Sequence, residues 1–240
     1  MEYPRLIFVV FVALWSRQGS ASAQFKDDPS CSDDVIDACG TDFVVFSKGP
    51  EIPDTPEKLA ESCKQELKSA ACAKDYATRC LLGFTRGAAL VAVNAVVEEL
   101  EGKCDTSHAA HKRYFQHVKC MNQAGERLHG CVKRYQQDLY VAARKASRKL
   151  KIPYACCQYY EFYSCCEEAL TEFCSDPDAA QLMRDTAENV FGNVLSVICG
   201  PFQKDSTHCL SLEALPQAGP NDTVPKNFIS PLKSIVLSVG

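Results

Sequence analysis

The amino-acid sequence predicts an all-α fold, a disulfide-stapled helical bundle built from two similar four-cysteine helical units with a basic helical middle. Two observations carry this prediction: 15 cysteines occur in 240 residues, and one cysteine spacing occurs twice. A third is that apolar residues recur at helical intervals on both sides of the middle. The chain is 46% hydrophobic and 23% charged, which is apolar enough for a core. We expect residues 24–209 to form one compact domain, followed by a tail at 210–240 whose last segment, residues 227–240, is frayed.

Residues 1–23 are typical of a secretory signal peptide. A basic start, a ten-residue apolar run at 6–15 and the small residues Ala21, Ser22 and Ala23 follow one another in the expected order. The apolar run is too short to span a bilayer. Because thiols are oxidised outside the cell, we expect a secreted, extracellular protein whose cysteines form disulfides. Loss of residues 1–23 leaves 24 basic and 29 acidic residues, a net charge of −5.

An acidic N-terminal segment, residues 24–53, precedes the first helical cysteine unit, residues 54–104. Asp54, or Thr55 with Pro56 in the first helical position, is a clear helix start, and this helix is expected to reach about Ala71. A second helix is expected from about residue 75 to residue 101. The unit contains four cysteines, with gaps of 9, 8 and 24 positions: Cys63, Cys72, Cys80 and Cys104.

The basic helical middle, residues 105–151, is predicted to form helices near 107–123 and 126–150. Between Lys103 and Lys151 the chain has 12 basic residues and three acidic ones, and four histidines lie there: His108, His111, His117 and His129. One alternative is that acidic blocks at 24–61 and 161–188 neutralise this charge within the molecule. The other is an outward face for a polyanion, in which four of five charges form two adjacent stripes on one helix: Arg144, Lys145, Arg148, Lys149 and Lys151. In that case histidine protonation would strengthen anion binding at low pH.

The second helical cysteine unit, residues 152–209, has cysteine gaps of 9, 8 and 25 positions at Cys157, Cys166, Cys174 and Cys199. Relative to the first unit, Cys156 and Cys165 are extra. The sulfurs of the helix before residue 174 point in every direction at 100° per residue, so we expect this helix to lie centrally. A further helix is predicted to begin at Ser175-Asp176-Pro177 and to end near Cys199.

The pairing of the cysteines is left open, since even four cysteines allow three arrangements. The extra cysteines Cys156 and Cys165 are natural partners for others outside the repeated spacing: Cys120, Cys131, Cys31 and Cys39. An odd count leaves one sulfur unpaired. We expect this to be Cys209, beside His208, which could link two chains into a dimer.

The segment Ile152-Pro153-Tyr154-Ala155-Cys156-Cys157, followed by Tyr160, Phe162, Cys165 or Cys166, Cys174 and a helix closing at Cys199, resembles a group of proteins. These are cysteine-rich, all-helical secreted arthropod proteins, including insect haemolymph glycoproteins of the 27-kDa type. The resemblance implies an extracellular protein without known catalytic residues. The doubled Cys165-Cys166 departs from the pattern, so it implies no pairing scheme.

Searches for catalytic and metal-binding motifs point to no enzyme. Gly83-Phe84-Thr85-Arg86-Gly87 imitates a nucleophile elbow, but a helix is expected there, and the glycines are better explained by close helix approach. His108 and His111 are one helical turn apart without an H-E-x-x-H motif, and no C-x-x-C pair exists. We therefore expect no catalytic residue, metal or cofactor.

Three functions follow from these observations. The leading hypothesis is an extracellular protein that binds a protein or polyanionic partner, with no nucleic acid and no stable membrane insertion. The alternatives are a carrier of a small lipophilic ligand between helices and an unrecognised enzyme. Asn221-Asp222-Thr223 is a candidate glycosylation site in the tail.

Overall fold

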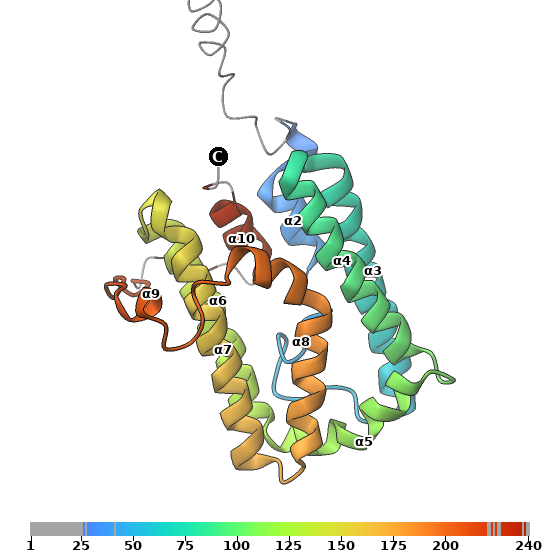
Figure 1. The fold of residues 1–240 in the computed structure, drawn as a ribbon. Helices are drawn as coiled ribbons and strands as arrows, with labels where there is room; N and C mark the ends of the chain where they lie inside the picture. The colour runs from blue at the N-terminus through green and yellow to red at the C-terminus, as the bar shows by residue number, and fades with distance from the viewer. Residues whose placement is uncertain are drawn as a thin grey trace, which may run out of the picture.

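A computed structural model of the chain describes residues 26, 28–40, 42–219, 222, 224, 227–236 and 238. Within these residues the protein is all-α, without a β-strand, as the sequence predicts (Figure 1). Short 3-10 helices lie at Pro29–Cys31 (η1) and Arg148–Leu150 (η2). The α-helices are α2 (Asp33–Cys39), α3 (Pro56–Cys80), α4 (Gly83–Cys104), α5 (Ala109–Gln123), α6 (Gly125–Lys145), α7 (Lys151–Phe173), α8 (Pro177–Ile198), α9 (Thr207–Leu210) and α10 (Ile229–Val236).

Side-chain caps place two of the long helices where the sequence predicts them. The Thr55 hydroxyl accepts a hydrogen bond from the Lys58 amide at 3.3 Å, and Pro56 occupies the first turn of α3. The Asp176 carboxylate accepts one from the Asp178 amide at 3.0 Å at the start of α8. Both caps satisfy amides that have no partner inside the helix.

The predicted break in the first unit, near residues 71–75, is wrong: α3 ends only at Cys80 and α4 begins at Gly83, more than two helical turns later. α3 continues through residue 71 to Cys80, because no glycine or proline interrupts this stretch, and the chain turns at Leu81 and Leu82. Gly83 then adopts φ +53°, a conformation that favours glycine. A Cβ at Gly83 or Gly87 would meet no atom within 4 Å, so these glycines do not serve close helix approach.

Seven disulfides staple the helices, and six of them form two sets of three with the same order. In each set of six cysteines, the first pairs with the fifth, the second with the fourth and the third with the sixth. The N-terminal set joins Cys31 with Cys80, Cys39 with Cys72 and Cys63 with Cys104. The second set joins Cys120 with Cys174, Cys131 with Cys165 and Cys156 with Cys199.

This pairing corrects the assignment within the cysteine doublets of α7. Cys156 and Cys165, which the spacing marks as extra, are the counterparts of Cys63 and Cys72, and Cys157 and Cys166 are the extra ones. The two members of a doublet are about 100° apart on the helix, so the direction of the partner helix decides which one pairs. The repeated pairing also reaches back to Cys31, into the segment that precedes the predicted first unit.

The two sets of disulfides hold two groups of helices. α3 packs against α4 in the N-terminal half, and α6 and α8 each pack against α7 in the C-terminal half. The halves meet where α4 contacts α5 and α8, and again at α10. The larger core lies between α5, α6, α7 and α8 and includes Leu139 and Leu170. A smaller core, which includes Ile36 and Tyr76, lies between α2 and α3.

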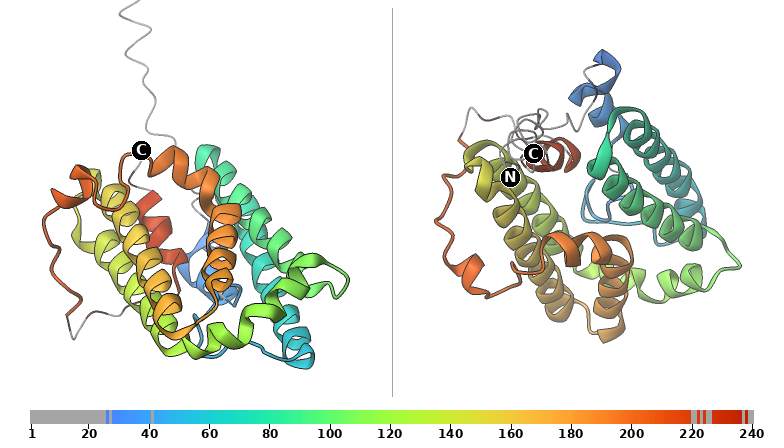
Figure 2. Two further views of the ribbon diagram at one scale, coloured as in Figure 1. Left: turned by 60° about the horizontal axis from the view of Figure 1, so that its bottom comes forward. Right: turned by 45° about the horizontal axis from the view of Figure 1, so that its top comes forward.

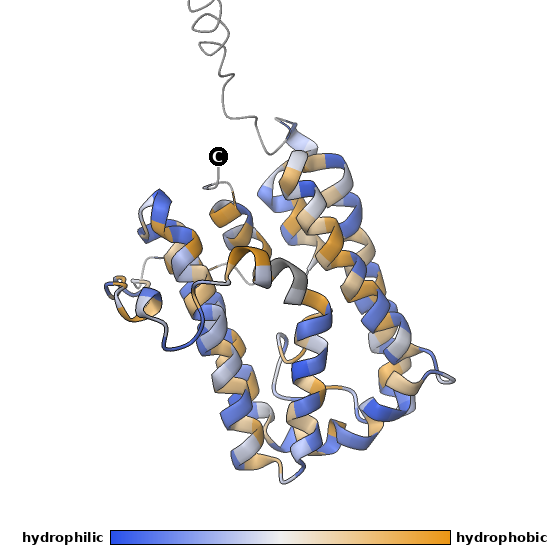
Figure 3. Ribbon diagram, viewed as in Figure 1, coloured by the Kyte–Doolittle hydropathy of each residue, from blue (hydrophilic) through white to orange (hydrophobic). Residues whose placement is uncertain are grey.

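The C-terminal tail is not frayed as expected, because α10 lies between the two halves (Figure 2, right). Its apolar residues appear as orange segments in Figure 3, and Ile235 is only 1% exposed. On the opposite side, Ser230 Oγ donates to Asp37 at 2.5 Å, and Lys233 Nζ lies 2.6 Å from Asp33 of α2. α10 is therefore an integral part of the fold.

Candidate anion-binding site at the α6–α7 turn

The predicted basic face is not part of a continuous helix, which corrects the expected helix at 126–150. α6 ends at Lys145, and Ala146 and Ser147 adopt extended backbone conformations before η2 and α7 begin. The chain must reverse here because α7 packs back along α6, where Cys131 and Cys165 join the two helices. Helical periodicity in the sequence does not by itself predict where the chain reverses.

The reversal gathers the five predicted basic residues at one end of the helical pair. We call this cluster the basic tip: Arg144, Lys145, Arg148, Lys149 and Lys151. Arg144 and Lys149 are exposed and form no ion pair with a described residue. Lys145 lies 3.3 Å from Asp222, and the Arg148 Nε donates a hydrogen bond to the Ser238 carbonyl at 3.3 Å.

A hollow of about 440 Å³ lies beside the basic tip. Arg148 and Lys151 line it from η2 and the first residue of α7, and the buried Ala146 is a further lining residue. Ser234 and Ser238, in and just after α10, line the remaining side. Two cationic groups and the Ser234 hydroxyl around one space fit a small oxyanion, because each can donate a hydrogen bond to oxygen. The Ser238 hydroxyl donates to the Ile235 carbonyl at 2.5 Å.

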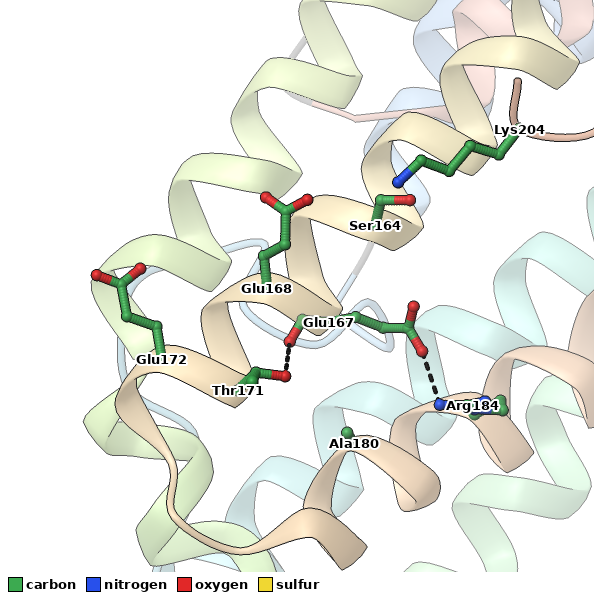
Figure 4. A pocket seen from close by; sticks show the side chains of 8 residues that line it. All are labelled: Ser164, Glu167, Glu168, Thr171, Glu172, Ala180, Arg184 and Lys204. Atoms are coloured by element: carbon green, nitrogen blue, oxygen red, sulfur yellow. Dashed lines mark hydrogen bonds and ion pairs between the residues drawn. The ribbon is translucent and has the colours of Figure 1, made fainter.

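A second hollow, of about 460 Å³, lies between α7 and α8 (Figure 4). Its charged groups have both signs: Glu167 accepts a 2.7 Å hydrogen bond from Arg184, and Lys204 extends toward Ser164. Its other lining residues are Glu168, Thr171, Glu172 and Ala180. The described lining residues of both hollows are mainly polar or charged, unlike the apolar lining expected in a carrier of a lipophilic ligand.

The four histidines lie away from the basic tip, so they do not add to its charge as expected. His117 on α5 donates to Asp176 at 2.6 Å, and His129, near the start of α6, donates to the Phe46 carbonyl at 2.7 Å. Sixteen residues of α6 separate His129 from Lys145, about 24 Å at 1.5 Å per residue. That separation exceeds the screening length of about 8–10 Å at physiological salt.

His108 and His111 are also occupied by backbone groups. The Ala110 amide donates to His108 at 3.1 Å, and His111 donates to the Lys103 carbonyl at 2.8 Å. In the part of the chain that the structure describes, no group of three or more histidine, cysteine, aspartate or glutamate side chains could hold a metal ion. The described helices also include none that is long and apolar enough to cross a membrane.

The expected unpaired cysteine is wrong. Cys209 is bonded to Cys157, and the free thiol belongs to Cys166, which is buried in α7. Burial raises the pKa of the Cys166 thiol to about 12. Neither sulfur is therefore an accessible thiol for a bond to a second chain. Spacing could not reveal this, because Cys165 and Cys166 differ by a single position.

Two further predictions concern residues outside the described part of the chain. These are the signal peptide at 1–23 and the glycosylation site at Asn221. Both stay predictions from the sequence.

Comparison with known proteins gives no match: no family model, no curated protein and no solved structure is similar to this chain. The resemblance to cysteine-rich arthropod proteins therefore stays a prediction that rests on cysteine spacing.

Proposed function

We propose that this protein is a secreted, disulfide-rich helical protein that binds a polyanionic chain, such as a sulfated glycan, through its basic tip. The observation that carries the proposal is the gathering of five basic side chains at one turn. Among the acidic residues that the structure describes, Asp222 is the one in an ion pair with this cluster. The seven disulfides support an extracellular location, because they require an oxidising compartment.

The proposal does not depend on the net charge of the whole chain. Salt screens exposed charges beyond about 8–10 Å, so a polyanion at the basic tip responds mainly to the local cluster. Other basic residues of this region form ion pairs within the molecule. Arg113 pairs with Asp185 at 2.7 Å, and Lys103 pairs with Glu66. The internal neutralisation that the sequence also allowed thus accounts for part of the basic middle, whereas Arg144 and Lys149 of the tip form no ion pair with a described residue.

A membrane surface is a weaker fit to the same cluster. Leu150, 39% exposed, is the apolar residue within the cluster, whereas interfacial membrane binding generally needs a wider apolar surface beside the cationic one. A free polyanion requires no such surface.

Chromatography on immobilised heparin tests the proposal. The wild type is expected to bind at low salt and to elute as ionic strength rises. Replacing Arg144, Lys145, Arg148 and Lys149 by glutamine is expected to abolish retention, with unchanged helical circular dichroism. The matched control replaces four exposed basic residues of the same segment, away from the tip: Lys112, Lys119, Arg127 and Lys133.

Both variants lose the same formal charge, but the control keeps the basic tip. The control is therefore expected to remain bound to the heparin column. Equal loss of retention in both would show that overall charge, rather than the basic tip, is responsible. A wild type that fails to bind at low salt would contradict the proposed function.

A further inference from the structure

The hollow beside the basic tip has two walls that come from distant parts of the chain. Arg148 and Lys151 belong to the α6–α7 turn, while Ser234 and Ser238 follow about 80 residues later, with α10. The guanidinium of Arg148 links the walls, since its Nε donates to the Ser238 carbonyl at 3.3 Å. A group bound in this hollow would contact both walls at once.

Both walls are held in place by contacts outside the hollow. Five and six residues beyond Lys151, Cys156 and Cys157 join α7 to Cys199 and Cys209. Ile235, between the two serines, is buried in the core, and Ser230 of the same helix donates to Asp37 of α2. Groups held in this way lose little conformational freedom on binding, which favours affinity.

The lining chemistry suits one kind of group. Arginine presents a planar fork of N–H donors that matches the oxygens of a sulfate or phosphate, and lysine adds a point charge. The Ser234 hydroxyl adds a donor without charge, while the Ser238 hydroxyl already donates to the Ile235 carbonyl at 2.5 Å and can only reorient or accept. Among the residues that the structure describes, the lining of the hollow has two cationic side chains and no carboxylate.

We propose that this hollow is a subsite for a single sulfate group of the polyanionic chain, and that α10 supplies one wall of it. The inference rests on the proposed function and deepens it. The basic tip then has two parts: Arg148 and Lys151 hold one sulfate group in the hollow, and the exposed Arg144 and Lys149 contact the neighbouring part of the chain. Since a sulfate group here touches both α10 and the α6–α7 turn, its binding stabilises the folded protein.

Inorganic sulfate is the probe that separates the hollow from the rest of the tip. Thermal unfolding is measured in sulfate and in chloride at equal ionic strength, and sulfate is expected to raise the Tm of the wild type. The shift is expected to disappear in the double variant Arg148→Gln, Lys151→Gln and in Ser234→Glu, which adds a negative charge to the α10 wall. It is expected to remain in two matched controls, Arg127→Gln with Lys133→Gln on α6, and the exposed Asn94→Glu on α4.

Heparin binding is measured on the same proteins. Loss of the hollow is expected to weaken binding by about tenfold, the effect of losing a charged hydrogen-bonded contact. The variant Arg144→Gln, Lys149→Gln is expected to lose heparin affinity while keeping the sulfate-dependent rise in Tm.

Two results would overturn the subsite. One is an equal sulfate effect on the wild type and Ser234→Glu, which would identify general salt stabilisation. The other is heparin binding that is lost with Arg144 and Lys149 but unchanged without Arg148 and Lys151. A sulfate effect confined to proteins with an intact hollow, in a wild type that does not bind heparin, would instead support the subsite and contradict the proposed function. Ser234→Glu keeps the test decisive if the double variant fails to fold.

Discussion

Cys166 occupies the position that corresponds to Ala73 in the N-terminal half, one residue after the paired Cys165 and Cys72. Both Cys166 and Ala73 are buried. The raised pKa, about 12, means that almost none of the thiol is ionised at neutral pH. Its position and chemistry are those of a core side chain, because the thiolate is the reactive form of cysteine.

The native protein is therefore expected to resist thiol-specific reagents at pH 7. After unfolding without reductant, one thiol per chain is expected to react, since the other 14 cysteines are paired. Cys166→Ala is expected to lower the free energy of unfolding by about 1 kcal/mol, the effect of a small cavity. Rapid labelling of the folded protein, or more than one reactive thiol after unfolding, would contradict the assignment.

Among the glycines that the structure describes, Gly125 has the closest backbone neighbour, the Pro50 carbonyl. A Cβ at this position would lie 1.8 Å from the Pro50 carbonyl oxygen, a backbone atom that cannot rotate away. The neighbouring contact is specific, because the Asn122 side chain bonds both the amide and the carbonyl of Ile52, at 2.9 Å each. The loop before α3 is thus seated against the α5–α6 junction.

Gly125→Ala is expected to destabilise the protein by about 1–3 kcal/mol, the range for overpacking. Gly130→Ala is the matched control on the same helix, since its Cβ would meet nothing within 4 Å. It is expected to be neutral or stabilising by up to about 1 kcal/mol, because alanine favours helix. Urea unfolding measures both, and equal effects would contradict the close approach.

At the scale of elements, the start of α8 is tied to α5 by one carboxylate. Asp176 accepts hydrogen bonds from the Asp178 amide and from His117, next to the disulfide between Cys120 and Cys174. The His117 hydrogen bond lowers the pKa of Asp176, with a smaller effect from the Asp178 amide. The ionised form is therefore the one that the folded state favours.

A lowered pKa means that the folded state binds this proton less tightly than the unfolded state does. The stabilisation by Asp176 is then fully present above the ordinary aspartate pKa and is lost as pH falls through the lowered value. Asp176→Asn is expected to reduce stability at pH 6 and to differ progressively less from the wild type toward pH 3. Asp178→Asn is the control, and urea unfolding across this range measures both. A difference that stays constant with pH would exclude this role of the carboxylate.

At the scale of the whole molecule, the disulfides connect elements that are far apart in sequence. Each of the seven disulfides joins cysteines that are 33 to 54 residues apart, and each of the long helices α3 to α8 has at least one of these cysteines within it or at its end. α4 shows why they matter: it is rich in apolar residues, yet few of its side chains are buried, and Phe84 is 65% exposed. Such a helix depends on its disulfide between Cys104 and Cys63 as well as on packing.

Reduction is expected to unfold the protein at moderate temperature. Each disulfide contributes about 2–4 kcal/mol, whereas the stability of a whole domain is about 5–15 kcal/mol. Circular dichroism in strong reductant is expected to show loss of helical signal and of the cooperative melting transition. The oxidised protein in the same buffer, without reductant, is the control. An unchanged Tm after full reduction would contradict the structural role of the disulfides.

Several elements followed from the sequence because the determining interactions are local. Thr55 with Pro56 and Asp176 with Pro177 mark helix starts through side chains that bond amides within three residues. The all-α class follows from apolar periodicity for the same reason. The helix boundary near residue 80 did not follow, because residues 72–80 have no strong helix-ending signal and the turn depends on the conformation of Gly83.

The candidate site could be predicted only in part. The sequence identified the five basic residues of the tip, but placed four of them on one continuous helix that the structure divides. The α10 wall of the hollow beside the tip could not be predicted, since Ser234 and Ser238 belong to a tail that was expected to fray. α10 is held in place by the core and by contacts with Asp33 and Asp37, which lie about 200 residues earlier in the sequence.

By itself, the sequence determined the helical class, the number of sulfurs available for pairing and the charge of the middle segment, because composition and short-range periodicity encode these properties. The tertiary structure decided which member of each cysteine doublet is bonded, where α6 reverses and what lies beside the basic tip. These depend on the direction in which a side chain points and on which distant surface lies opposite it. One residue of shift turns a helical side chain by about 100°, and a one-dimensional spacing cannot specify its partner.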